Sequence, residues 1–122
     1  MISVVIYRED DGTCPLLDWL ASLPRKARNK CVVRIERLKE LGHGLRRPEA
    51  DYLRDGIYEL RAKHSGIDYR ILYFIHGRAA VVLSHGIMKR AAEVPSKEIE
   101  LAIRRRRRFA ADPEQHTYEE NS

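Results

Sequence analysis

The chain has 122 residues, 43% of them hydrophobic, and its 23 basic residues exceed its 18 acidic residues to give a formal net charge of +5. This length suits one domain with a modest core, and the positive charge favours a polyanionic partner over a basic one. The short apolar run at the start excludes a signal peptide or membrane span, and two cysteines without metal-ligand spacing argue against a metal site or a disulfide scaffold. We therefore expect a soluble, cytoplasmic protein that needs no metal or cofactor.

The first part of the chain predicts a strand and two helices. The β-branched run from Ile2 to Tyr7 suits a buried strand, which the turn sequence REDDGT ends. Pro15 suits the first turn of a short helix, and Pro24 opens a second one that ends near Gly42. Apolar residues recur in this second helix at steps of three and four, as expected for a buried face: Ala27, Cys31, Ile35, Leu38 and Leu41. Its other faces are basic, which suits either a solvated surface or a binding surface.

The second part predicts a three-stranded meander and a helix. Three strand-like runs, Ile57 to Lys63, Asp68 to Ile75 and Ala79 to Ile87, are separated by short spacers with glycine, which suit hairpins rather than parallel crossovers. The segment PSKEIELAIRRRRRFAAD predicts a helix, because acids near its start and arginines at its end complement the helix dipole.

The expected fold is therefore α+β. It has a small antiparallel sheet with a C-terminal β-meander, packed against two N-terminal helices and one C-terminal helix. Residues 1–111 form the single expected domain, and residues 112–122 are expected to be a polar, flexible tail.

One face of the first meander strand carries charge. Because residues two apart on a strand share a face, Glu59, Arg61 and Lys63 lie together, and we expect this face to be open. Cations on a sheet with interleaved aromatic residues suit single-stranded RNA, because guanidinium groups hold phosphates while rings stack on bases. Tyr73 and Phe74 alternate sides, however, so at least one of them belongs to the core, and Tyr69 has the same alternative.

Several motifs follow one another between Gly56 and Phe109: YELR, YRILYF, a glycine-containing hairpin, SHGIMKR and PSKEIELA. In this order they resemble the phage-derived HigB-like branch of the RelE/ParE toxin superfamily. The resemblance implies a RelE-like fold and the toxin of a type II toxin–antitoxin system, whose antitoxin we expect to be a helix-turn-helix protein. It also implies an mRNA interferase, that is, a ribosome-dependent endoribonuclease that contacts ribosomal RNA. A ParE-like toxin that binds gyrase and a noncatalytic RNA-binding regulator remain as alternatives.

Cleavage of RNA without a metal uses the 2′-hydroxyl of the substrate as nucleophile, so the protein supplies proton transfer and stabilises the phosphorane. The resemblance assigns Arg70 to the scissile phosphate, where a planar pair of donors fits the developing charge; its alternative is an ion pair with Asp68. Arg61 and Lys63 match basic positions on the preceding strand. Glu59 is either a carboxylate base or a salt-bridge partner of Arg61 or Lys63.

The end of the third meander strand supplies further candidates. Lys89 and Arg90 match the final basic pair of the family and are expected to neutralise the transition state or bind ribosomal RNA. His85 suits proton transfer near neutral pH, since an unperturbed histidine has a pKa of about 6.5, but a structural role is the alternative. The C-terminal tyrosine of RelE-type toxins is not evident, because Tyr118 lies in the tail. The expected catalytic set is Arg70, Arg61, His85, Lys89 and Arg90.

The run Arg104 to Arg108 turns around a helix axis by about 100° per residue, so it cannot form one binding stripe. Its members suit contacts to RNA or to an acidic antitoxin segment, or simply a solvated helix end. We expect an acidic or amphipathic antitoxin segment to cover the basic sheet. The expected RNA-binding set is Lys63, His64, Arg78, Arg104, Arg105 and Arg108.

Overall fold

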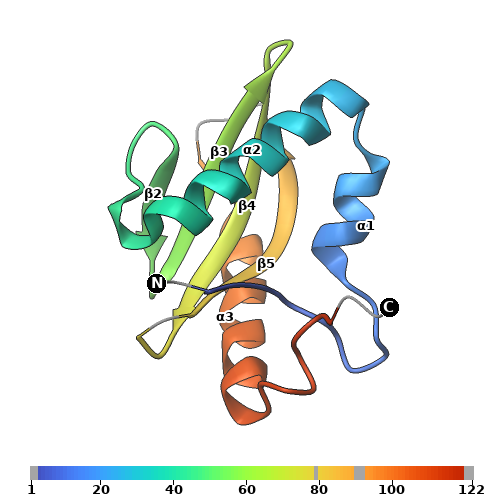
Figure 1. The fold of residues 1–122 in the computed structure, drawn as a ribbon, viewed down its shortest axis with the longest axis vertical. Helices are drawn as coiled ribbons and strands as arrows, with labels where there is room; N and C mark the ends of the chain where they lie inside the picture. The colour runs from blue at the N-terminus through green and yellow to red at the C-terminus, as the bar shows by residue number, and fades with distance from the viewer. Residues whose placement is uncertain (1–2, 79, 90–92, 120–122) are drawn as a thin grey trace.

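The computed structural model describes residues 3–78, 80–89 and 93–119, and within these ranges five strands and three α-helices form an α+β fold (Figure 1). The elements are β1 (Ser3–Ile6), α1 (Pro15–Ser22), α2 (Arg25–Leu41), the 3-10 turn η1 (Gly42–Gly44), β2 (Ala50–Arg54), β3 (Ile57–His64), β4 (Ile67–His76), β5 (Ala80–Lys89) and α3 (Ser96–Ala111). The predicted helices and meander strands are confirmed to within a few residues at their ends. Ile2 and Ala79, at the starts of two predicted strands, lie outside the described ranges.

The sheet is mixed, with the strand order β1-β5-β4-β3-β2. The meander β3–β4–β5 is antiparallel as expected, but β1 pairs with β5 in parallel, so the prediction of an antiparallel sheet is wrong at this edge. The two helices between β1 and β2 belong to the long connection that a parallel pair requires. β1 is also an edge strand rather than the buried strand that its β-branched residues predicted, since no residue in it is fully buried.

The other edge strand, β2, was not predicted. It pairs antiparallel with β3 across the tight turn Asp55–Gly56, in which both residues have positive φ, 51° and 81°. An Asp-Gly pair is a strong hairpin signal, because a two-residue turn of this type needs positive φ at both positions. The strand was not predicted because the sequence ADYLR is largely polar, whereas the Asp-Gly turn that follows it is a recognisable hairpin signal.

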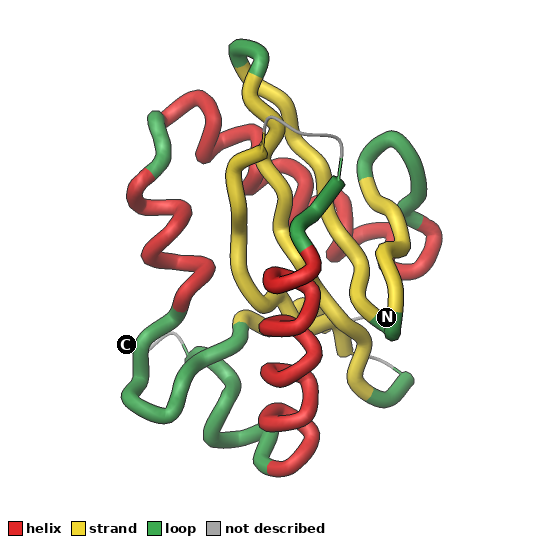
Figure 2. The backbone as a smooth tube through the Cα atoms, turned by 180° about the vertical axis from the view of Figure 1, so that it is seen from behind, coloured by secondary structure: helices red, strands yellow, loops and turns green. Residues whose placement is uncertain are grey.

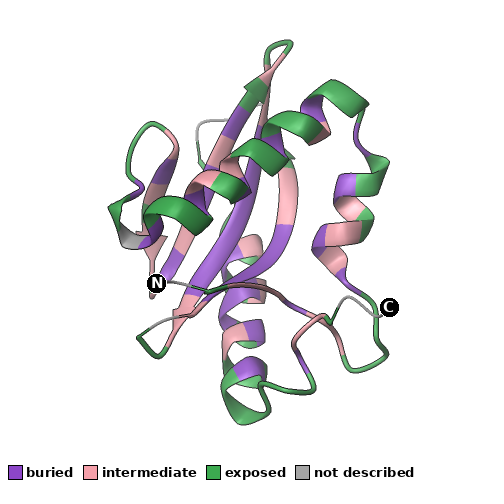
Figure 3. Cartoon of the chain, viewed as in Figure 1, coloured by how far each residue is buried: buried purple, intermediate pink, exposed green. Residues whose placement is uncertain are grey.

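Helices cover both faces of the sheet. α1 and α2 lie on one face and α3 lies on the other, as the views from the front and from behind show (Figures 1 and 2). Successive residues of β4 therefore enter different cores: Ile71 packs with the α1/α2 side, and Leu72 with α3. Buried residues accordingly fill the middle of β4 without a break (Figure 3). Of the predicted apolar face of α2, Leu41 alone is exposed, at the end of the helix.

The C-terminal segment after α3 returns to β1. The amide of Tyr118 donates to the carbonyl of Ile6 at 2.8 Å, and Thr117 forms an isolated β-bridge with Tyr7. The rings of Tyr7 and His116 stack with centroids 5.2 Å apart. None of the helices in the described ranges has the length and apolar composition to cross a bilayer.

Candidate functional site

The register of the sheet brings two predicted catalytic arginines face to face. Arg61 on β3 lies directly opposite Arg70 on β4, and Lys89 on β5 lies opposite Asp68, the residue two before Arg70. Like charges at directly opposed positions destabilise a sheet, so this arrangement requires a nearby anion. Glu59, two residues before Arg61 on the same face of β3, supplies it.

Glu59 joins the two arginines through both of its carboxylate oxygens. Nη1 of Arg70 donates to Oε1 at 2.6 Å, and Nε of Arg61 donates to Oε2 at 2.8 Å. Arg61 also donates from Nη2 to Oδ2 of Asp51 on β2 at 3.1 Å, and Arg47 donates from Nε to the same oxygen at 2.9 Å. We call these five residues, Arg47, Asp51, Glu59, Arg61 and Arg70, the Glu59 cluster.

The expected open face is wrong for part of this cluster. The side chain of Glu59 is 1% exposed and that of Arg70 is 9% exposed, whereas that of Arg61 is 33% exposed. The cause is α3, which packs on the face that carries Glu59 and Arg70. The opposite face is covered by α1 and α2. The nearest partner of Arg70 is Glu59, and Asp68, the partner considered as the alternative to a catalytic role, lies 3.9 Å from its Nη2.

Lys89 and Arg70 carry buried donors without acceptors. Among the described residues, neither Nζ of Lys89 nor Nε of Arg70 has a hydrogen-bond partner. Burial, reinforced by the neighbouring Arg70 guanidinium, lowers the pKa of Lys89. A buried donor that lacks an acceptor costs free energy until a water or an anion reaches it.

A pocket of about 410 Å³ opens over the Glu59 cluster. Arg61, Arg70 and Glu59 line it on the side of the sheet, and the start of α3 with the residues before it also contributes to the lining. Its lining consists of Tyr52, Leu53, Arg54, Glu59, Arg61, Arg70, Glu93, Val94, Ser96 and Ile99. The arrangement offers guanidinium donors to an anion in a partly desolvated space, where such contacts are stronger than in open water.

His85 belongs to a different polar cluster. It lies opposite Leu72, next to a bulge in β5, and its Nδ1 is 2.8 Å from Oγ of Ser84 while its Nε2 is 3.1 Å from Oε1 of Glu98. Burial and the nearby Arg105 lower its pKa. Among the residues that the structure describes, His85 is not one of those that line the pocket over the Glu59 cluster. Arg90, the remaining member of the expected catalytic set, lies outside the described residues.

The expected RNA-binding residues do not share one surface. Lys63 and His64 lie at the end of β3, whereas Arg78 lies in the β4–β5 turn at the opposite end of β4, about 30 Å away along a strand of ten residues. Arg104 and Arg108 are exposed on α3. Arg105, by contrast, is buried, and it donates to Glu9 at 3.2 Å and to Ser84 at 3.4 Å. Its charge is therefore paired within the protein and is not presented on the surface.

Sequence reasoning missed Arg47, Asp51 and Arg54. Asp51 lies opposite Glu59 because the β2–β3 register shifts between Tyr52 and Arg54. The Asp-Gly hairpin alone would have placed Asp51 opposite Leu60, on the other face of the sheet, so the position of Asp51 was not readable from the turn. In the described residues, no group of three or more His, Cys, Asp or Glu side chains is arranged to hold a metal ion.

Comparison with known proteins identifies the family. A search of curated proteins finds no match. The family model described as "Phage derived protein Gp49-like (DUF891)" matches residues 18–107, a range that includes α2, the whole β2–β5 region and most of α3. Because this match spans well over half of the sequence, the chain belongs to the phage-derived Gp49-like family, which is associated with toxin–antitoxin systems.

Proposed function

We propose that this protein is the toxin of a type II toxin–antitoxin system and that it cleaves messenger RNA on the ribosome, in the manner of HigB-like endoribonucleases. The observation that carries the proposal is the opposed pair Arg61 and Arg70 in the lining of a pocket, held by the buried carboxylate of Glu59. Membership of the Gp49-like family supports the toxin–antitoxin context.

In the proposed reaction, the ribose 2′-hydroxyl attacks the adjacent phosphorus and the 5′-oxygen leaves. The phosphorane gains negative charge on its non-bridging oxygens, which is where fixed guanidinium donors act most strongly. Arg61 is the more accessible of the two arginines and receives the phosphate, while Arg70 supports the charge from beneath. Lys89 adds positive charge to this end of the sheet.

We assign Glu59 to orientation rather than to proton transfer. Both of its oxygens accept hydrogen bonds from arginines and its side chain is 1% exposed, so a substrate hydroxyl group has little access to it. Its contacts fix the two guanidinium planes before the substrate arrives, which lowers the reorganisation needed in the transition state. Exposed cations outside the pocket, among them Lys63, Arg104 and Arg108, suit contacts with ribosomal RNA phosphates.

The proposal is tested with Arg61, because this side chain is accessible and its loss leaves Glu59 paired with Arg70. Arg61→Gln should reduce single-turnover cleavage of messenger RNA on programmed ribosomes by about 100- to 1,000-fold, and Arg61→Lys should recover binding better than rate. Cleavage sites are mapped at nucleotide resolution, with excess chelator added once ribosome integrity has been verified. Arg25→Gln, an exposed arginine at the start of α2, is the matched control.

A folded Arg61→Gln protein that cleaves at the wild-type rate would remove Arg61 from the reaction. DNA damage that precedes translation arrest after induction of the wild-type protein would instead indicate a gyrase-directed toxin. Binding to ribosomes without any cleavage would indicate an RNA-binding regulator. Co-expression with a helix-turn-helix protein encoded next to this chain should relieve growth arrest if that protein is the antitoxin.

A further inference from the structure

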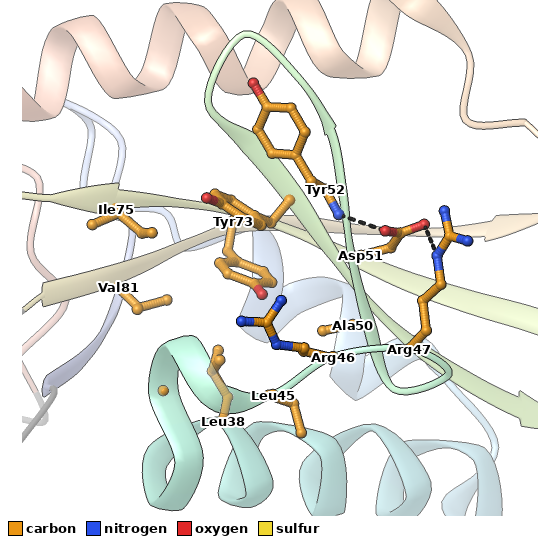
Figure 4. A pocket seen from close by; sticks show the side chains of 12 residues that line it. Leu38, Leu45, Arg46, Arg47, Ala50, Asp51, Tyr52, Tyr73, Ile75 and Val81 are labelled. Carbon is orange, nitrogen blue, oxygen red and sulfur yellow. Dashed lines mark hydrogen bonds and ion pairs between the residues drawn. The ribbon is translucent and has the colours of Figure 1, made fainter.

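A second pocket lies on the α2 side of the sheet, the face opposite to the Glu59 cluster. It has a volume of about 540 Å³ and forms where α2 ends, between the turn after this helix and the strands β2 to β5 (Figure 4). We call it the tyrosine pocket, because Tyr52, Tyr58 and Tyr73 lie next to one another across β2, β3 and β4 and line it together. Its volume lies within the range of about 300–1,000 Å³ that is typical of ligand sites.

The tyrosine rings form a ladder. Tyr58 and Tyr73 stack with centroids 5.3 Å apart and ring planes 16° from parallel, and Tyr52 meets Tyr58 edge to face at 5.0 Å. Apolar side chains complete the walls: Leu38, Leu45, Ile75 and Val81. Flat rings bordered by aliphatic groups suit a flat aromatic ligand.

Two polar side chains that line the pocket, Tyr73 and Arg46, are available to a ligand. Tyr73 is 4% exposed, and within the described part of the chain its hydroxyl makes no hydrogen bond to another residue, although the hydroxyl oxygen itself is not fully buried. Burial raises the pKa of this hydroxyl, so it remains a donor at neutral pH. Arg46 also has no ion pair among the described residues, and its guanidinium points into the pocket, whereas that of Arg47 turns away to Asp51 (Figure 4).

The tyrosine pocket is joined to the Glu59 cluster across the edge strand β2. Tyr52 lines both pockets. Asp51, which also contributes to the tyrosine pocket, accepts from Arg47 on one side and from Arg61 on the other. A chain of linked nucleotides that crosses the β2 edge would therefore meet guanidinium groups on both sides of it.

We propose that the tyrosine pocket binds one nucleobase of single-stranded RNA, with the phosphate of that nucleotide at Arg46, while a neighbouring phosphate lies at Arg61. The base is held between tyrosine and leucine side chains, and the Tyr73 hydroxyl donates to its edge. The unpaired Arg46 favours a nucleotide over an uncharged apolar side chain of a protein partner. This inference rests on the proposed function only for the identity of the ligand as RNA.

The test uses the full chain and a fluorescein-labelled hexaribonucleotide with 2′-O-methyl riboses, which lacks the nucleophile and is not cleaved. Affinity is measured by anisotropy for the intact oligomer and for a series with one abasic position each. Removal of the bound base should weaken binding by about fivefold to a hundredfold, as expected for the loss of one stacking contact. Tyr58→Leu should weaken binding of the intact oligomer similarly, but should not weaken the oligomer that already lacks that base.

Two further variants separate stacking and charge from folding. Tyr58→Phe keeps the ring, so the affinity of this variant should still depend on the presence of the bound base almost as strongly as that of the wild type. Arg46→Gln should reduce the dependence of log affinity on log salt concentration by about one unit, the value for one phosphate contact. Tyr118→Leu, in the C-terminal segment, is the matched control and should change neither quantity.

The outcomes distinguish this inference from the proposed function. If the effects of Tyr58→Leu and of each abasic position on the binding free energy simply add, the tyrosine pocket does not bind a base. In a protein that still cleaves messenger RNA, this result would overturn the base-binding site and leave the nuclease proposal intact. Coupling between Tyr58 and one base in a protein that does not cleave would support the site and contradict the nuclease. Tyrosine ring signals that shift with an acidic amphipathic peptide but not with the oligomer would make the pocket a protein-docking site and overturn the inference.

Discussion

Replacing Arg70 alone should destabilise the protein, although an arginine on an open strand would be removed at little cost. Its side chain is 9% exposed and its partner Glu59 is 1% exposed, so Arg70→Met leaves a buried carboxylate with one guanidinium instead of two. Methionine keeps much of the apolar stem of arginine, so that the substitution mainly removes charge and hydrogen bonding.

The size of the effect follows from the geometry of Glu59. Breaking a buried ion pair by removing one partner costs about 3–5 kcal/mol. Because Arg61 remains bonded to Oε2 at 2.8 Å, we expect a cost just below this range, about 2–3 kcal/mol. That is a large share of a typical stability of about 5–15 kcal/mol, but it leaves the protein folded at 25 °C. The melting temperature should fall by roughly 10 °C.

Urea unfolding of four proteins measures this directly: wild type, Arg70→Met, Glu59→Gln and the double variant. The double variant should be more stable than Arg70→Met by at least about 1 kcal/mol, since it no longer buries an undercompensated charge. If Arg70→Met unfolds at the same urea concentration as wild type, the assigned role of the ion pair is wrong. The same holds if adding Glu59→Gln to Arg70→Met recovers no stability.

Two further predictions concern other parts of the fold. A Cβ at Gly86 would overlap the ring of Trp19, so Gly86→Ala should cost about 1–3 kcal/mol and change the fluorescence of the single tryptophan, whereas Gly44→Ala, with no described atom near the added group, should be neutral by both measures. The folded-state pKa of His85 lies below its ordinary value of 6.5, so the unfolded chain binds the extra proton first, and stability should fall as the pH is lowered through 6.5. His85→Gln should flatten this slope in urea unfolding measured between pH 5 and pH 8, and an unchanged slope would refute the assignment.

Local patterns in the sequence predicted the helices and the meander. Ala27, Cys31, Ile35 and Leu38 are buried as their spacing indicated, because one face of a helix repeats every three or four residues. The parallel pairing of β1 with β5 was not predictable in this way, since partner choice between strands so far apart depends on how the helices pack. β2 was missed because its residues are polar and few.

Part of the site was predictable and part was not. Alternation placed Glu59 and Arg61 on one face of β3, and the short hairpin to β4 brought Arg70 opposite Arg61. Alternation does not tell which faces are covered, so the burial of Glu59 and Arg70 was missed. The run ILYF in β4 contained the signal, because a strand that is apolar on both sides is covered on both sides. The separation of His85 from the Glu59 cluster was not predictable, because the bulge in β5 and the contact with Glu98 depend on the tertiary fold.

The position of the candidate site follows from a difference in length between strand and helix. β4 has ten residues and spans about 33 Å, whereas α3 has 16 residues and spans about 24 Å. α3 runs roughly along the strands on its face of the sheet (Figure 2) and is too short to follow β4 over its whole length. Arg61 and Arg70 lie near the start of this helix with Glu59 between them, and there Arg61 stays 33% exposed while Arg70 and Glu59 are buried. Ser96 and Ile99 at the start of α3, and Val94 just before it, form one side of the pocket, so changes in the segment that leads into α3 should alter access to the arginines before they alter the sheet.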